Sequence, residues 1–187
     1  MTLYDPGMPM LEARAAYFAA NDFGQDGGYD DDVVWFALGP LKFPVPNTAG
    51  RKVAVRYHDL HHIVTGYDTD WRGEFEIAAY EIGAGCERLL AAWVINLGGL
   101  MAGLVLMPSR TTRAFYRGRH SHSLYKEDLQ RLLGARVHEV RTVAGCETAS
   151  EQPGPGDRRA LLGWLAVALA MHLVPLALVA TGIAIML

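Results

Sequence analysis

Three histidines and an aspartate lie within five positions near the middle of the chain, and a glutamate follows twelve residues later. The residues are His58, Asp59, His61 and His62, with Glu74 after them. Imidazole nitrogens and carboxylate oxygens are the ligands that divalent metals such as Zn²⁺ bind in proteins. The pattern therefore predicts a metal site, and His58 and Asp59 are the candidate catalytic residues within it.

A helical conformation would bring most of these side chains together. At about 100° per residue, His62 lies about 40° and Asp59 about 100° from His58, whereas His61 falls about 60° away on the other side. We therefore predict His58, Asp59, His62 and Glu74 as the metal ligands. His61 is left as a neighbour of the site or a surface residue.

The four predicted ligands require two helices joined by a short turn. Gly66 is a stop signal for a helix that begins near residue 49, and Asp70 can cap a second helix whose first turn contains Glu74. Such a hairpin places the start of the second helix beside the end of the first. Glu81, two turns further on, could accept a hydrogen bond from a ligand histidine.

Most of the remaining pattern up to residue 146 is typical of helices. We expect the second helix to continue into the apolar run 89–107, which reaches the lower limit of length for a membrane span. We favour a core helix that lines an apolar cavity or lies in the membrane surface, because a membrane span would separate the next segment from the metal site. The proline-rich stretch before residue 49 is expected to be a rigid connector. The other expectations are helices over residues 11–20 and 123–133, a short helix or extended segment over 33–38, and an extended piece over 137–143.

Several arginines alternate with aromatic residues between positions 109 and 119. The planar guanidinium group suits carboxylate and phosphate groups. Arg113, Arg117 and Arg119 are therefore candidate ligands for an anionic substrate, and a solvated basic face is the alternative.

The C-terminal part of the chain has a different composition. Residues 147–157 form a polar linker with prolines and glycines, and the segment from residue 160 to the end has no formal charge. At about 1.5 Å per residue it is long enough to cross a bilayer. We therefore predict a transmembrane anchor over residues 158–187. The arginine pair before it places the folded domain, residues 1–146, in the cytoplasm.

Composition limits the classes of function. Apolar residues make up 51% of the 187 residues, charged residues make up 20%, and the net charge is −3. Without a basic block or stripe, a nucleic-acid partner is not expected. The two cysteines, Cys86 and Cys146, form no CxxC pair, so neither a disulfide framework nor a zinc knuckle is indicated. The expected fold class is all-α: a compact domain with a metal-binding helical hairpin, plus a C-terminal transmembrane helix.

The chain also resembles the Coq4 family of ubiquinone-biosynthesis proteins. That family's HDxxH motif, followed by eleven residues and a glutamate, is met by His58, Asp59, His62 and Glu74. The flanking landmarks are residues 43–48, Arg51, residues 65–67, Gly73, residues 116–119, Leu124 and residues 140–141. The match runs over roughly residues 30–145, but His61 and the C-terminal segment depart from the family pattern.

The resemblance implies a mostly helical fold and a divalent metal, expected to be Zn²⁺, at those four residues. It implies a membrane-associated protein that acts on prenylated quinone precursors or another isoprenoid lipid, in C1 decarboxylation and hydroxylation of the ring. It also implies contact with other ubiquinone-biosynthesis proteins. With the predicted anchor, the expected location is the bacterial inner membrane, and we expect a homo-oligomer.

Two functions of different classes remain open. In the first, the metal is a Lewis acid in an oxidative decarboxylase, the arginine segment orients the anionic group, and the 89–107 helix accommodates the prenyl chain. In the second, the metal only joins two helices, and the protein is a lipid-binding scaffold for other enzymes. A metal phosphohydrolase of the His-Asp type needs further ligands from other helices, and no second motif provides them.

Overall fold

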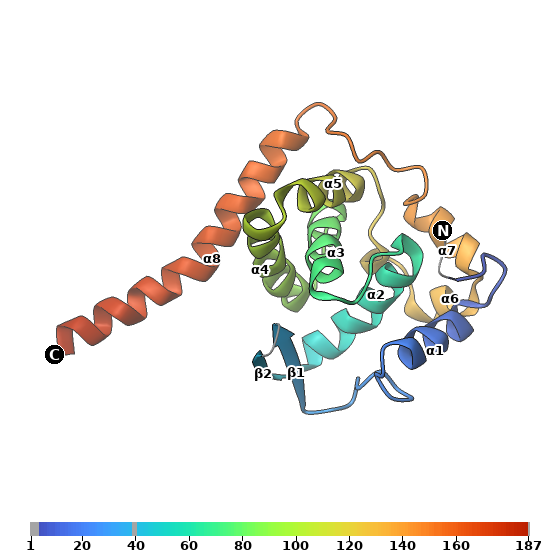
Figure 1. Ribbon diagram of the computed structural model, residues 1–187, viewed down its shortest axis with the longest axis horizontal. Coiled ribbons are helices and arrows are strands. Elements are labelled where there is room, and N and C mark those ends of the chain that lie inside the picture. Colours follow the sequence, from blue (N-terminus) through green and yellow to red (C-terminus); the bar gives the residue numbers. More distant parts are fainter. Residues whose placement is uncertain (1–3, 39–40, 187) are drawn as a thin grey trace.

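The computed structural model describes residues 4–38 and 41–186, with side chains described outside 36–43 and 174–186. The described chain is mostly helical, with a two-stranded sheet at one edge (Figure 1). In chain order the elements are α1 (Met10–Ala20), β1 (Val33–Leu38), β2 (Leu41–Pro46), α2 (Ala49–Thr65), α3 (Trp71–Ala84), α4 (Leu90–Leu106), α5 (Pro108–Arg119), the 3₁₀ turn η1 (Leu124–Lys126), α6 (Leu129–Gly134), α7 (Val137–Ala144) and α8 (Asp157–Met186).

The predicted helical hairpin is confirmed in α2 and α3. The Thr48 hydroxyl accepts a backbone hydrogen bond at the start of α2, and Gly66 ends this helix with a φ of 77°, a left-handed conformation that favours glycine. The Asp70 carboxylate then accepts two backbone N–H groups of the first turn of α3. These local signals fix the hairpin before any long-range contact is made.

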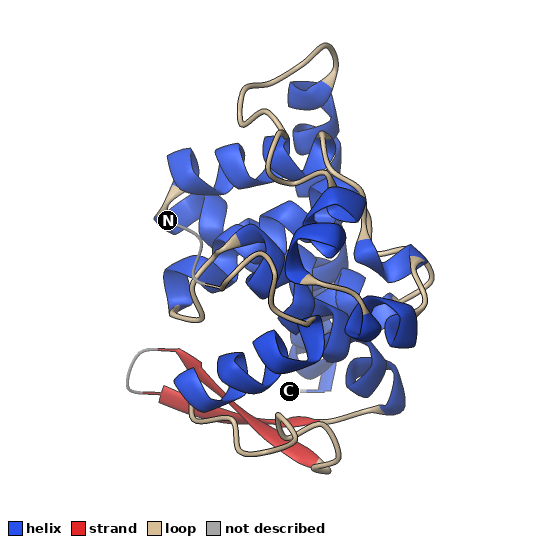
Figure 2. Ribbon diagram, turned by 90° about the vertical axis from the view of Figure 1, so that its right-hand side faces the viewer, coloured by secondary structure: helices blue, strands red, loops and turns tan. Residues whose placement is uncertain are grey.

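The strands β1 and β2 show that the expected all-α class is wrong. They pair as an antiparallel hairpin that lies apart from most of the helices (Figure 2). The prolines of β2, Pro44 and Pro46, are two residues apart, so both lie on the same side of the strand. A strand with only one neighbour tolerates them where no ladder N–H is needed. The stretch expected to be a connector is thus β2, while Pro40 lies outside the described residues.

The expected continuous helix from residue 71 to 107 is interrupted between α3 and α4. Gly85 has a φ of 96° and Glu87 a φ of 52°, and both values are incompatible with a helix. The turn brings α4 back against α3, where a Cβ on Gly99 would lie 2.6 Å from the Cβ of Ala78. The apolar run is therefore a core helix that packs closely, as favoured from the sequence.

Two shorter expectations also need correction. Residues 123–133 form η1 and α6 instead of one helix, and residues 137–143 are helical in α7 instead of extended. The buried Arg141 side chain of α7 donates hydrogen bonds to the carbonyl groups of Ile63 and Val64 near the end of α2. Carbonyl groups in the last turn of a helix have no N–H donor within that helix. The guanidinium group of Arg141 supplies the missing donors from a distant element.

The N-terminal segment closes the domain through backbone pairing. The N–H of Met10 donates to the carbonyl of Ala135, and the N–H of Val137 donates to the carbonyl of Met8. Apolar side chains of α1, α2, α6 and α7 form one core cluster around this contact, and those of α3, α4, α5 and α8 contribute to a second.

The expected transmembrane anchor is wrong for the part of the chain that the structure describes, because none of its helices combines the length and apolarity that crossing a membrane requires. One side of the described part of α8 packs on the domain, while Leu162 and Leu173 on the other side are 64% and 50% exposed. Leu161 and Ala168 are buried in the second core cluster, and the ring of Trp164 stacks on that of Trp93 in α4 at 4.6 Å. Tertiary packing thus covers some of the apolar residues that the sequence pattern assigned to lipid.

Helices α3 and α5 cross at a contact that has no room for side chains. A Cβ on Gly83 would lie 2.3 Å from the carbonyl oxygen of Phe115, and one on Gly118 would lie 2.1 Å from that of Tyr80.

We expect Gly83→Ala and Gly118→Ala each to lower the free energy of unfolding by at least about 2 kcal/mol, because the backbone must move to make room for the added methyl group. Urea denaturation measures this. The control, Gly163→Ala in α8, meets nothing within 4 Å and should be neutral or stabilising; equal loss in all three variants would contradict the close crossing.

Candidate metal centre

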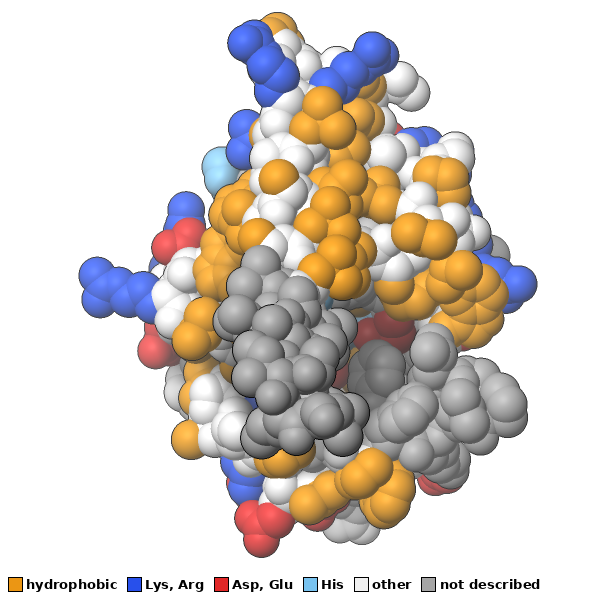
Figure 3. Space-filling view, turned by 90° about the vertical axis from the view of Figure 1, so that its left-hand side faces the viewer, with side chains coloured by type: hydrophobic (Ala, Val, Ile, Leu, Met, Phe, Trp, Pro, Cys, Tyr) orange, Lys and Arg blue, Asp and Glu red, His pale blue; other side chains and the backbone are white. Residues whose placement is uncertain are grey.

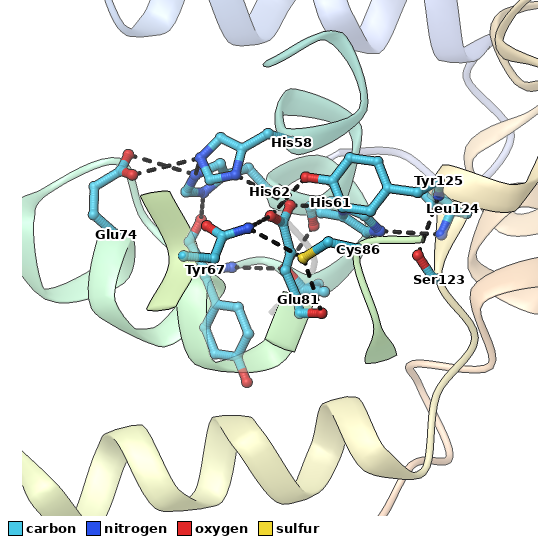
Figure 4. Close-up of polar contacts among 12 residues, drawn as sticks. His58, His61, His62, Tyr67, Glu74, Glu81, Cys86, Ser123, Leu124 and Tyr125 are labelled. Carbon is cyan, nitrogen blue, oxygen red and sulfur yellow. Dashed lines mark hydrogen bonds and ion pairs between the residues drawn. The ribbon is translucent and has the colours of Figure 1, made fainter. Parts of the chain in front are cut away.

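His58, His62 and Glu74 converge between the last turns of α2 and the first turn of α3, near the turn that joins the two helices (Figure 4). The two histidines are one turn apart on α2, and their Nε2 atoms lie 3.1 Å from each other. One oxygen of Glu74 lies 3.5 Å from Nε2 of His58, and its other oxygen lies 3.5 Å from Nε2 of His62. Three potential ligands therefore face a single point.

The hydrogen bonds of the two histidines fix which ring nitrogens are free. His58 Nδ1 lies 3.1 Å from a carboxylate oxygen of Glu81, and His62 Nδ1 lies 2.9 Å from the carbonyl oxygen of Tyr67. Both partners are acceptors, so each Nδ1 carries a proton and donates it. In the neutral rings the two Nε2 lone pairs then point at each other across 3.1 Å, an arrangement that either a proton or a metal ion between them would stabilise.

The separations fit a small divalent metal. Ligand atoms about 2.0–2.1 Å from a tetrahedral zinc ion lie ~3.3 Å from one another, between the 3.1 and 3.5 Å found here. Two histidines and one carboxylate leave at least one coordination position for water or substrate. The described residues thus provide a possible metal-binding triad of the open, catalytic type.

Glu81 is the centre of a buried hydrogen-bond network behind the triad. One of its oxygens accepts from Nδ1 of His58 and, at 2.7 Å, from Nδ1 of His61. The other accepts from the Asn96 amide and, at 2.7 Å, from the Tyr125 hydroxyl. All four acceptor positions of the carboxylate are therefore filled. The predicted role of Glu81 as acceptor for a ligand histidine agrees with this geometry.

His61 belongs to this network and not to the metal triad. Its Nε2 accepts the backbone N–H of Leu124 at 3.2 Å, and so its Nδ1 carries the proton that Glu81 accepts. The side chain is fully buried. The helix thus directs His58 and His62 toward the metal position, and His61 toward the interior.

Burial and interaction with oppositely charged neighbours shift the pKa values of the site's acids and bases in opposite directions. Burial alone would raise the pKa of Glu81 and Glu74, but the hydrogen bonds and charges of the neighbouring histidines hold the pKa of each well below its usual range. Burial would lower the pKa of His58, yet the carboxylates of Glu81 and Glu74 outweigh it and raise that pKa well above its usual range. Both carboxylates are therefore ionised and available as ligand and support.

Asp59, the fourth predicted ligand, does not join the triad. Its carboxylate accepts a hydrogen bond of 2.6 Å from the Tyr29 hydroxyl, and burial raises its pKa. On the helix it points about 100° from His58, toward the loop that precedes β1. Asp59 does line a cavity that His58 and Glu74 also line.

The arginines predicted to bind substrate have other partners. Arg117 donates to the carbonyl groups of Cys146 and Thr65. Arg119 pairs with Asp157 at the start of α8, and Arg113 pairs with Glu151. None of the three lines either cavity beside the triad.

Two cavities meet at the metal position. The first, about 390 Å³, is bounded mainly by small and aliphatic residues of α2, α3 and α4, including Ala78, Gly99 and Ala102. The second, about 350 Å³, is rich in aromatic rings. Those rings belong to Tyr17, Phe23, Trp35, Trp71 and Phe75. Arg51, Val55, His58, Glu74 and Phe75 line both.

Arg51 is the site residue that the sequence reasoning did not single out. It is half-buried, and burial lowers its pKa, partly opposed by Asp59 and Glu74. A signal was present: residues 51, 55, 58 and 62 follow helical spacing and share one face of α2. Asn96 and Tyr125 were missed for a different reason, since only the return of the chain brings them to Glu81.

Comparisons with known proteins add neither a family nor a structural relative: no family model, no curated protein and no solved structure matches this chain. The resemblance to the Coq4 family thus stays a prediction, and the inference of function depends on the geometry of the site.

Removing a ligand should remove the metal. We expect His62→Ala and Glu74→Gln to reduce bound Zn²⁺ from about one ion per chain to less than about a tenth, because two ligands hold zinc poorly. Mass spectrometry of the metal retained after gel filtration measures this. His122→Ala, on an exposed histidine outside the triad, is the matched control; unchanged zinc in both triad variants would contradict the site.

Metal affinity should also depend on pH in the neutral range. Because the pKa of His58 is raised, its ring is protonated at neutral pH without metal, and a metal must displace that proton. Affinity should therefore fall as pH decreases, starting above the usual histidine pKa of about 6.5. Calorimetry in buffers of different ionisation enthalpy would detect the released proton. Binding that releases no proton at pH 7 would contradict the raised pKa.

Proposed function

We propose that this protein is a metal-dependent enzyme that acts on an aromatic ring carrying a long apolar chain. One observation carries the proposal: an open triad of His58, His62 and Glu74 lies where an aliphatic cavity and an aromatic cavity meet. A purely structural metal site usually has four protein ligands and no adjacent cavity. The open coordination position therefore favours catalysis over a scaffold role.

The aliphatic cavity suits a prenyl or similar chain. Its α4 wall carries glycines and alanines that leave space, and Ile95 and Leu106, which also line it, are 45% and 60% exposed. The cavity thus reaches the surface beside apolar residues. Hydrophobic side chains are also gathered along α8 on the face shown in Figure 3. An apolar chain could therefore enter beside Ile95 and Leu106.

The aromatic cavity suits a planar ring. Tyr17, Trp35 and Trp71 provide faces and edges of the kind that aromatic ligands pack against. Asp59 lines the same cavity and is positioned to accept a hydrogen bond from a ring hydroxyl. The ring would then lie beside the metal, with its chain on the α4 side.

The resemblance to the Coq4 family narrows the proposed reaction to the ring of a coenzyme Q precursor. Replacing a ring carboxyl group by hydroxyl releases carbon dioxide and adds one oxygen atom. With dioxygen as its source, the second oxygen atom leaves as water and a two-electron reductant is needed. A bound divalent metal, for which we propose Zn²⁺, would supply Lewis-acid polarisation of a substrate oxygen. Glu81 keeps His58 in the ligating tautomer.

A direct assay tests the proposal. The protein, loaded in turn with Zn²⁺, Fe²⁺ or Mn²⁺, is given dioxygen, a reductant and a prenylated 4-hydroxybenzoate labelled at the carboxyl carbon. We expect labelled carbon dioxide from at least one metal form, and a rate lower by at least about 100-fold in Glu74→Gln, with His122→Ala unchanged. Retention of the labelled lipid without any release of carbon dioxide would contradict catalysis and support the scaffold alternative.

A further inference from the structure

We propose that Arg51 is the residue that recognises an anionic group on the substrate, at the opening shared by the two cavities. This inference rests on the proposed function, because it assigns the polar group that a ring-and-chain substrate must present there. The sequence pattern predicted that arginines of α5 bind the anionic group, whereas this proposal assigns that role to an arginine in the first turn of α2.

The position of Arg51 is the first argument. It lines both cavities together with His58 and Glu74. It also lies two helical turns before His58 on the same face of α2, about 10 Å along the axis. A substrate held at Arg51 could therefore reach the metal with another atom of its ring.

The second argument is that Arg51 has no competitor. Among the described residues it is the only lysine or arginine that lines either cavity. The arginines of α5 are used elsewhere: Arg110 pairs with Glu76, and Arg113 pairs with Glu151. Within the part of the chain whose side chains are described, Arg51 is therefore the one permanently charged cation that a negative group in either cavity would meet.

The third argument is that the guanidinium group is held in place yet mostly free. Its Nη1 donates to the side-chain oxygen of Asn47 at 3.0 Å. Asn47 is itself buried, and its amide nitrogen is fixed by the carbonyl groups of Tyr29 and Asp31 at 3.2 and 2.7 Å. This leaves most of the five N–H donors of Arg51 without a hydrogen-bond partner among the described residues.

The charge of Arg51 is likewise uncompensated by a direct contact. No ion pair joins it to a carboxylate of the described chain, and Asp59 and Glu74 act on it only as nearby charges. Glu74 faces the two histidines, and Asp59 is bonded to Tyr29. A half-buried arginine with an anchored base and open donors has the geometry of an anion-binding residue.

Binding measurements on the zinc-loaded full chain test this inference. The probes are 3-geranyl-4-hydroxybenzoic acid and its neutral primary amide, which differ only in the charged group. We expect wild type to bind the acid at least about 10-fold more tightly than the amide. Arg51→Gln should weaken acid binding by about 10- to 100-fold and change amide binding little. Arg51→Lys, which retains charge without the planar fork, should be intermediate.

Arg113→Gln is the matched control, because it removes an exposed arginine that lines neither cavity; both affinities should be unchanged. Zinc content is measured in every variant, and Arg51→Met replaces Arg51→Gln if the latter loses zinc. Two results would overturn the role of Arg51 and leave the proposed function intact. One is equal affinity of wild type for the acid and the amide, and the other is an undiminished preference for the acid in the Arg51 variant. Wild type that binds neither probe would overturn the proposed function as well.

Discussion

The rest of the structure depends on the buried carboxylate of Glu81. Moving an unpaired carboxylate into a protein interior costs several kcal/mol or more, so this side chain requires partners from several elements. It receives hydrogen bonds from His58 and His61 of α2, Asn96 of α4 and Tyr125 of η1. The same four bonds hold these elements around α3 and orient a ring of the metal triad. The stability of the core and the geometry of the site therefore share one polar network.

Local signals were sufficient to predict the elements that carry the triad. The Gly66 stop and the Asp70 cap defined the α2–α3 hairpin, and helical spacing put His58 and His62 on one face with Glu74 opposite. The same spacing places Asp59 about 100° from His58, and in the structure this direction turns its carboxylate away from the triad. Tyr29, whose hydroxyl binds Asp59 in the structure, is 30 positions away, and no local pattern connects the two.

The wrong predictions concern features that depend on distant parts of the chain. The sequence of an apolar run does not show whether lipid or protein will cover it. In α8, for example, the Trp164 ring stacks on the Trp93 ring of α4. The break at Gly85 interrupts a pattern that remains helical on both sides, so its position follows from how α4 packs on α3. Arginine side chains are equally ambiguous, because Arg117 could have faced a substrate or, as found, the backbone carbonyl of Thr65.

The backbone pairing of Met8 and Met10 with Ala135 and Val137 has a consequence for biosynthesis. A ribosome makes the first of these partners roughly 125 residues before the second, so α1 can contact α2 early, but the α6 and α7 part of its docking surface is missing while most of the chain is being translated. Closing so long a loop is entropically costly and slow compared with forming a local hairpin. The α2–α3 hairpin can therefore form early on the nascent chain, while the domain around it is completed only after residue 137 has left the exit tunnel.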